Sequence, residues 1–229
     1  TAFDWRALGG TTVAKNQGGC GSCWAFATVG QLESHARIYD ARILDLSEQA
    51  IIDCNAYGAD CDGGWLFAAY EVFDSYGAVD EACIPYLASH GHPCTQAACE
   101  PLARISSPGY VGIPNAVSEI KHSVYNTGPV ATSMYVHDNF YNYTGGCWSA
   151  DYANTPNHAV LIVGWDDNAC GGSGAWIGKN SWGRNWGIDG FFYIQYGVCS
   201  IGSYNYQIDY VPSVVYVEVL SPPFGESTS

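Results

Sequence analysis

The stretch GGCGSCW, residues 18–24, carries two side chains with obvious chemistry, the thiols of Cys20 and Cys23. Such a pair can be a redox couple at a helix start, half of a zinc site, or two halves of structural disulfides. The redox role is disfavoured because the preceding Lys15–Gln17 segment shows no buried parallel strand. The zinc role is disfavoured because the remaining cysteines lack the usual ligand spacing. On the number of cysteines alone, both thiols could still be halves of structural disulfides.

The composition is that of a packed globular protein. Hydrophobic residues make up 48% and charged residues 13% of the 229 residues, which argues against disorder and allows a sizeable core. With 22 acidic and 8 basic residues the formal net charge is -14, so the surface repels polyanions and no nucleic-acid partner is expected. The apolar runs are too short for a bilayer, and no membrane partner is expected.

The cysteine content indicates where the protein works. Ten cysteines are unusual in a reducing cytosol, so we expect a secreted, extracellular or lysosome-like oxidising compartment. The sequence begins at Thr1 without an initiator Met or signal-type segment, as expected of a processed product.

The segment that follows the two thiols predicts a helix. Apolar residues recur at helical spacing from Cys23 to about Tyr39, which places Cys23 at the start of a helix with one buried face. Ser47 followed by Glu48 resembles a capped start. Further helices are expected over 47–54, 64–76 and 117–125, and loops over 82–114.

The second half of the chain has the composition of strands. After Gly128-Pro129, short segments rich in β-branched and aromatic residues alternate with Gly, Asn and Asp. Strands are expected over 130–135, 159–165, 175–179 and 191–196, with one more over 211–220. This order predicts an α+β fold, a helical part packed against a β-rich part.

The sequence around Cys23 resembles the active-site segment of papain-like cysteine peptidases. Residues 17–26 contain that family's C-G-[SA]-C-[WY] core, and other family landmarks follow in order. These are LSEQ at 46–49, DC at 53–54, CDGG at 61–64, IPY at 84–86, GPV at 128–130, NHAV at 157–160 and KNSWG at 179–183.

The resemblance implies a two-lobe fold with the active-site cleft between the lobes. A peptidase domain is expected over 1–210, with a helical left lobe mainly over 10–110 and a β-barrel-like right lobe mainly over 111–210. Residues 211–229 are expected to form a C-terminal extension or linker.

The resemblance also assigns catalytic roles. Cys23 would be the nucleophile, its thiol pKa lowered from about 8.5 by the helix N-terminus and an imidazolium. His158 would be that imidazolium, donating its proton to the leaving amine. Asn180 would orient the ring, with Trp182 shielding the contact. The Gln17 side chain and the Cys23 N–H would form the oxyanion hole.

Substrate binding is implied at further matched positions. Gly63 and Gly64 would present backbone groups to an extended peptide. The other positions are Trp65, Leu66, Ser133, Asn157, Ala159, Trp182 and Tyr204. The S2 pocket, which takes the second residue before the scissile bond, would be walled by Trp65, Leu66, Ser133, Ala159 and Tyr204. None of these side chains is charged, so an apolar or aromatic substrate side chain is expected there.

An endopeptidase is expected, because the loop that carries His90 and His92 is too short to fill the cleft. Partners are therefore peptide or protein substrates, together with an inhibitory propeptide that the family requires and that this sequence lacks. No cofactor and no metal are implied, and a monomer is expected.

The resemblance implies disulfides Cys20–Cys61 and Cys54–Cys94. The pair Cys83–Cys99 would bracket the same loop, and Cys147–Cys199 would leave Cys170 free. Two alternatives remain: a non-catalytic homologue, which usually lacks the nucleophile, and a transferase in which an amine intercepts the acyl-enzyme.

Overall fold

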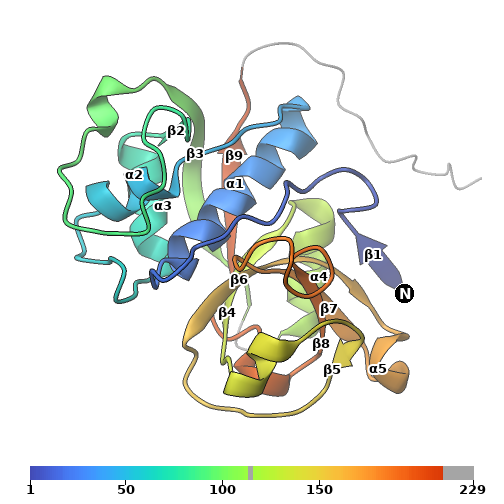
Figure 1. Cartoon of the computed structure of the whole chain (residues 1–229). Helices are drawn as coiled ribbons and strands as arrows, with labels where there is room; N and C mark the ends of the chain where they lie inside the picture. The colour runs from blue at the N-terminus through green and yellow to red at the C-terminus, as the bar shows by residue number, and fades with distance from the viewer. Residues whose placement is uncertain (113–115, 214–229) are drawn as a thin grey trace, which may run out of the picture.

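The computed structural model describes residues 1–112 and 116–213 as a mixture of helices and one extended sheet (Figure 1). The helices are α1 (Cys23–Asp40), α2 (Glu48–Cys54), α3 (Leu66–Ser75), α4 (Val117–Asn126) and α5 (Ala169–Gly172), with short 3₁₀ turns at Gln96–Ala98, Asp138–Asn142 and Val198–Ser200. The strands are β1 (Ala2–Asp4), β2 (Ala78–Val79), β3 (Pro101–Tyr110), β4 (Val130–Met134), β5 (Cys147–Trp148), β6 (His158–Asp166), β7 (Ala175–Lys179), β8 (Phe191–Gln195) and β9 (Tyr206–Val211).

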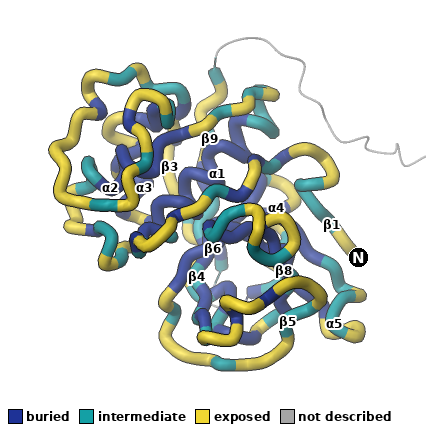
Figure 2. Tube along the Cα trace, viewed as in Figure 1, coloured by how far each residue is buried: buried dark blue, intermediate teal, exposed yellow. Residues whose placement is uncertain are grey.

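Helix α1 runs through the middle of the molecule. It begins at Cys23, as the periodicity predicted, but the expectation of a single buried face is wrong: every residue from Trp24 to Ala36 is buried. The helix contacts α2 and α3 on one side and β4, β6 and β9 on another, and Figure 2 shows it as the continuous buried stretch at the centre. Its buried polar side chains are paired, as when Gln31 Nε2 donates to Pro129 O at 2.9 Å, with the exception of His35 Nε2, which has no partner.

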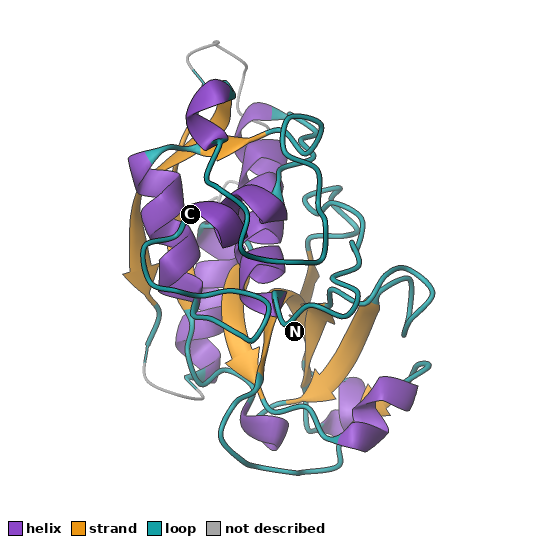
Figure 3. Ribbon diagram, turned by 60° about the vertical axis from the view of Figure 1, so that its left-hand side comes forward, coloured by secondary structure: helices purple, strands orange, loops and turns teal. Residues whose placement is uncertain are grey.

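The other predicted helices are confirmed with small shifts of their ends. The Ser47 hydroxyl accepts a hydrogen bond from Ala50 N at 3.0 Å, which caps α2 as its sequence indicated. Helices α3 and α4 lie within one or two residues of the expected ranges at each end. In Figure 3 helices dominate the upper half of the view, and the lower half holds mainly strands and loops.

The strands form a nine-stranded sheet in the order β2-β3-β9-β4-β6-β7-β8-β5, with β1 added beside β6. The four strands predicted after Gly128-Pro129 are present as β4, β6, β7 and β8. Within the described ranges the strands at the two ends of this order, β2 and β5, do not pair with each other. The α+β class is therefore correct, but the sheet is open and the β-barrel-like description was too strong.

The expectation of loops over 82–114 is wrong for its last third. Residues Pro101–Tyr110 form β3, which pairs antiparallel with β9. Half of the residues of β3 are exposed and only Ala103 and Ile105 are buried, so its Pro, Gly and Ser content matched that of a surface loop. Strand β9 was missed, and it ends at Val211; residues 214–220 of the predicted last strand lie outside the described residues.

Buried side chains form two large clusters. One surrounds α1 and α3 and includes Trp24, Leu32 and Phe73. The other lies between α4 and strands β6 to β8 and includes Ile120, Trp176 and Phe192. None of the helices in the described ranges is long and apolar enough to cross a membrane.

The disulfides agree with the expected pairs in three cases and differ in one. Cys20–Cys61, Cys54–Cys94 and Cys83–Cys99 are present. The expected Cys147–Cys199 pair is wrong, because Cys147 is bonded to Cys170, with their Cα atoms 5.4 Å apart. The turn of α5 lies against β5 and brings Cys170 there, whereas Cys199 is buried with a free thiol.

Candidate active site

A Gly-rich turn places Cys23 at the first position of α1. Gly21 N–H donates to Cys61 O at 2.7 Å, and a Cβ on Gly21 would come within 2.6 Å of that oxygen, so only glycine fits this approach. The Cys20–Cys61 disulfide anchors the same turn. The first N–H groups of α1 have no partner within the helix, and their partial positive charge lies beside the Cys23 thiol.

His158 comes to Cys23 from the sheet. It is the first residue of β6, a strand whose first eight residues are all buried and which packs against α1. The next residue, Ala159, donates its N–H to Cys23 Sγ at 3.4 Å. Two segments far apart in the sequence thus meet at one thiol.

Asn180 holds the His158 ring from behind. It follows the end of β7, which pairs with β6, and its Oδ1 lies 2.8 Å from His158 Nε2. Because Nε2 is engaged by Asn180, Nδ1 is the ring nitrogen left to face Cys23. Trp182 covers the contact, with its ring centroid 4.9 Å from that of His158.

The two titratable groups shift each other's pKa in opposite directions. Burial by itself raises the pKa of the Cys23 thiol, but the charge of His158 and hydrogen bonds from His158, Ala159 N and Trp24 N lower it overall. Burial by itself lowers the pKa of His158, but the Cys23 thiolate and the Asn180 hydrogen bond raise it overall. The arrangement favours a thiolate–imidazolium pair.

Gln17 is held beside the thiol by bonds at both ends of its amide. Its Nε2 donates to Cys20 O at 2.8 Å, and its Oε1 accepts from Ser181 Oγ at 2.6 Å. Because the Cys20 carbonyl can only accept, it fixes which end of the amide is the donor, and the Ser181 hydroxyl holds the other end. One N–H of this amide remains for a group in the cleft.

Two positioning residues, Ser181 and Tyr86, were not predicted. The Tyr86 hydroxyl donates to Gln17 O at 2.8 Å and lies 2.7 Å from Ser22 Oγ, so it ties the Gly-rich turn to the loop after β2. Both residues stand inside family landmarks, which was the available signal, but nothing in their spacing indicated a hydrogen bond to Gln17.

Cys23, His158, Gln17 and Trp182 line a cleft of about 770 Å³. Every predicted site residue lines it except Asn180, which is 3% exposed and lies behind His158. Residues that line it without having been predicted include Gly21, Asp62, Phe67, Val136, Tyr141 and Tyr206.

The cleft wall expected to form the S2 pocket comes from paired strands. Ser133 of β4 lies opposite Ala159 of β6 in the sheet register. Tyr204 is 54% exposed at the rim, and Tyr206 at the start of β9 lines the same cleft. The Asn157 side chain is already engaged, accepting from Val136 N at 2.7 Å, and its N–H donates to Met134 O at 3.1 Å, so its backbone carbonyl is the group left to meet a ligand.

Gly63 and Gly64 have different reasons to be glycine. A Cβ on Gly64 would come within 2.6 Å of the Trp24 ring, so Gly64 permits packing against α1. Gly63 has φ +133° and no heavy atom within 4 Å of a built Cβ, so it faces open space in the cleft. The Gly63 N–H and C=O are themselves paired with Asp60 O and N, so an extended peptide that passes over the open face of Gly63 is left the backbone of Gly64.

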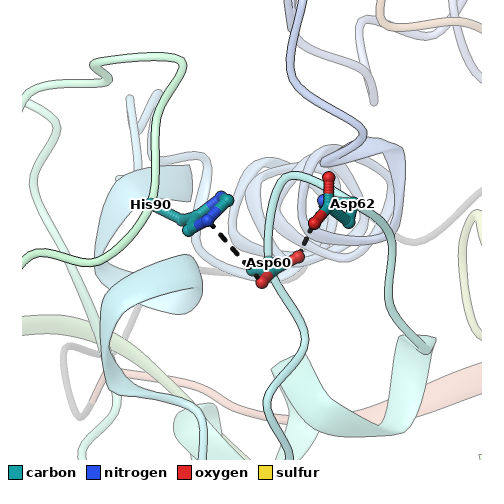
Figure 4. A group of neighbouring side chains, drawn as sticks. All are labelled: Asp60, Asp62 and His90. Carbon is teal, nitrogen blue, oxygen red and sulfur yellow. Dashed lines mark hydrogen bonds and ion pairs between the residues drawn. The ribbon is translucent and has the colours of Figure 1, made fainter.

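The histidines of the 87–94 loop lie apart from the cleft lining. Figure 4 shows His90 directed at Asp60, with Nε2 3.9 Å from Oδ2, and Asp62 on the far side of Asp60. His92 Nε2 lies 2.9 Å from Ser89 Oγ. The ligand atoms of His90, Asp60 and Asp62 lie within 4.8 Å of one another. These side chains are partly or fully solvent-exposed, and exposed acidic groups commonly gather without an ion, so we assign them no metal.

Comparisons with known proteins place this geometry in a family. Residues 1–208 match the family described as papain family cysteine protease. The chain is 37% identical over 204 residues to the viral cathepsin of Choristoneura fumiferana nuclear polyhedrosis virus, covering 89% of this chain and 61% of the relative. It is 35% identical over 201 residues to fruit bromelain of Ananas comosus, covering 87% of this chain and 56% of the relative. The chain thus spans less than two thirds of these relatives.

Solved structures are similar over nearly the whole described fold. The bromelain protease of Ananas comosus in complex with the E64 inhibitor superposes with a TM-score of 0.83 at 32% identity, covering 91% of this chain and 98% of that one. The digestive procathepsin L 3 of Tenebrio molitor larval midgut superposes with a TM-score of 0.80 at 33% identity, covering 91% of this chain and 69% of that one.

Proposed function

The chain belongs to the papain family of cysteine proteases, and on that premise we propose that it is a cysteine endopeptidase. The observation that carries the proposal is the contact of Cys23 with His158 inside an open cleft, with Asn180 bonded to the far side of the His158 ring. The lowered pKa of Cys23 and the raised pKa of His158 both favour the ion pair in the free enzyme.

In the first half of the reaction, the Cys23 thiolate attacks the carbonyl carbon of the scissile peptide bond. The carbonyl oxygen becomes an oxyanion, which accepts hydrogen bonds from Gln17 Nε2 and the Cys23 N–H. His158 Nδ1 gives its proton to the departing amine, the C–N bond breaks, and the acyl group remains on Cys23 as a thioester.

In the second half, His158, now neutral, takes a proton from water as that water attacks the thioester. The second tetrahedral intermediate collapses, the carboxylate product leaves, and the proton restores the imidazolium beside the thiolate. Asn180 keeps the ring in one orientation throughout, and Trp182 keeps water from the Asn180 contact. A neutral amide suits this role because the reactant state is already an ion pair.

Specificity follows from the walls of the cleft. Trp65, Leu66, Ser133, Ala159 and Tyr204 would wall the S2 pocket and favour an apolar or aromatic side chain there. The backbone of Gly64, reached over the open face of Gly63, would hold the peptide in an extended conformation, and the Asn157 carbonyl would bind the peptide next to the scissile bond.

The surroundings of the cleft support internal cleavage. His90 is directed at Asp60, His92 Nε2 lies 2.9 Å from Ser89 Oγ, and neither histidine is among the cleft-lining residues. The substrate's C-terminal side is therefore not blocked by this loop.

We also propose a monomeric peptidase domain over 1–210 with lobes at 10–110 and 111–210, followed by the 211–229 extension. Four disulfides favour a secreted or lysosome-like compartment. An inhibitory propeptide is proposed because two similar solved structures are a procathepsin and a proform.

The test is labelling with an epoxysuccinyl thiol-protease inhibitor together with turnover of a fluorogenic dipeptide amide under reducing conditions. We expect one label at Cys23 and turnover between pH 4 and 8, both absent in Cys23→Ala. Cys199→Ala is the matched control, because Cys199 is the other free thiol. Absence of both reactions in the wild type, or their survival in Cys23→Ala, contradicts the proposal. Products from a long peptide distinguish internal from terminal cleavage and hydrolysis from acyl transfer.

A further inference from the structure

Three large aromatic side chains stack on the outer rim of the cleft beyond Gly64. Trp65, Phe67 and Tyr57 are 55%, 38% and 46% exposed. The Trp65 and Phe67 rings are stacked with centroids 5.9 Å apart, and Tyr57 meets Phe67 edge-on at 4.9 Å. Trp65 and Phe67 line the same cleft as Cys23. We call these three rings the aromatic shelf.

Core packing does not account for the position of Phe67. On α3 it shares its exposed face with Glu71 and Asp74, whereas Leu66, Ala68, Ala69 and Tyr70 point into the core. Its ring contacts are with the two other exposed rings of the shelf. A contiguous exposed apolar patch continuous with a cleft is typical of a binding surface.

The shelf is held rigidly. Trp65 is the N-cap of α3 and Phe67 its second residue. Tyr57 lies between Cys54 and Cys61, each of which is tied by a disulfide, and its N–H donates to Asn55 Oδ1 at 3.1 Å. Binding a ligand here would therefore cost little conformational entropy, which favours binding.

We propose that Phe67 and Tyr57 form a subsite for an aromatic side chain at the fourth residue before the scissile bond. This rests on the proposed endopeptidase function, which puts the second residue in the pocket of Leu66 and Ala159. The chain of the substrate then runs past Gly63 and Gly64 toward Trp65. Trp65 stands in the wall proposed for the second residue, and the two further residues of an extended chain span about 6.6 Å. This is close to the 5.9 Å between the Trp65 and Phe67 rings, so the fourth residue reaches the outer part of the shelf.

The test compares a fluorogenic dipeptide amide with two tetrapeptide amides that differ only in Phe or Ala at the fourth position. In the wild type we expect Phe to raise kcat/KM about tenfold over Ala through a lower KM, equivalent to about 1.4 kcal/mol. In Phe67→Ala and Tyr57→Ala this preference falls to within about twofold, and dipeptide turnover is unchanged. Tyr76→Ala is the matched control, because Tyr76 is 45% exposed at the C-terminal end of α3 and does not line the cleft.

A preference for Phe that persists in both variants, or is missing in the wild type, overturns the subsite. Equal loss of dipeptide turnover in Phe67→Ala also overturns it, because the ring then serves packing. Binding of the two tetrapeptides with a reduced, uncleavable CH₂–NH linkage gives a second readout by fluorescence anisotropy. We expect the same tenfold preference in Kd. This measurement tests the subsite even if the dipeptide is not cleaved. Failed dipeptide cleavage would count only against the proposed endopeptidase function.

Discussion

The two free thiols of the molecule lie in opposite surroundings. Cys23 opens an 18-residue helix, lines the cleft and is in contact with His158. Cys199 lies in a three-residue turn after β8, is 1% exposed, and donates its hydrogen to Ala150 O at 3.3 Å. The same residue type is a nucleophile candidate in one place and a core residue in the other.

The difference shows that a charged partner and access to solvent, more than the thiol itself, decide reactivity. Two histidines show the same effect of surroundings on pKa. His158 has the Cys23 thiolate beside it, and its pKa is raised. His35 is fully buried in α1, and although its Nδ1 lies 2.9 Å from Gln31 O and Asp209 adds a weak raising effect, burial lowers its pKa to about 4.

Exchanging each thiol gives the largest expected contrast. Cys23→Ala should lower kcat/KM about 10⁴-fold or more, since the nucleophile is lost, with the free energy of unfolding nearly unchanged. Cys199→Ala should leave kcat/KM within about twofold and lower the free energy of unfolding by about 1–2 kcal/mol, because it leaves a small buried void. Steady-state kinetics and urea unfolding of both variants measure these effects. Comparable losses of kcat/KM in the two variants would contradict the different roles assigned to Cys23 and Cys199.

The oxyanion donor is expected to come next in size. Gln17→Ala should lower kcat about 10²–10³-fold, the usual cost of one such donor. Ser181→Ala removes the hydroxyl that orients the Gln17 amide, so it should cause a smaller loss of the same kind, with KM little changed. A larger effect of Ser181→Ala than of Gln17→Ala would contradict the positioning role.

Asn180 should affect both rate and pH dependence. Its hydrogen bond raises the pKa of His158, and activity requires the imidazolium, so the alkaline limb of the pH–rate profile belongs to that group. Asn180→Ala should move this limb to lower pH and reduce kcat between about 10- and 100-fold, the range for a hydrogen bond to a charged group. A profile with an unmoved alkaline limb would argue against this role.

His35 should affect stability alone. Its folded pKa of about 4 lies below the ordinary 6.5, so between these values the unfolded chain binds a proton that the folded chain does not, and stability falls as pH falls from 6.5 to 4. At 1.36 kcal/mol per pKa unit the loss is about 3 kcal/mol. His35→Phe should lessen the decline seen in urea unfolding from pH 7 to 4; an equally steep decline in this variant would exclude His35 as its source.

Much of the site could be predicted from the sequence, because its residues stand in short, chemically distinctive segments. Cys23, His158, Asn180 and Gln17 were all expected, and the structure brings them together. Ser181, Tyr86 and Tyr206 were not expected, because their contributions arise from contacts between segments distant in the sequence. No local pattern encodes such contacts.

The fold was predictable where patterns were strong. The periodicity of α1 and the apolar run of β6 identified those elements, whereas the exposed strand β3 had the composition of a loop. The Cys147–Cys170 pair was missed because nothing in the spacing indicated that the α5 turn folds back onto β5.

Alkylation of native thiols by iodoacetamide from pH 4 to 9, followed by peptide mapping, tests the central claim most directly. We predict labelling of Cys23 with an inflection well below the usual thiol pKa of about 8.5, an upward move of that inflection in His158→Ala, and no labelling of Cys199 before unfolding. An inflection at or above 8.5 in the wild type, or labelling of Cys199 at the rate of Cys23, would contradict the account.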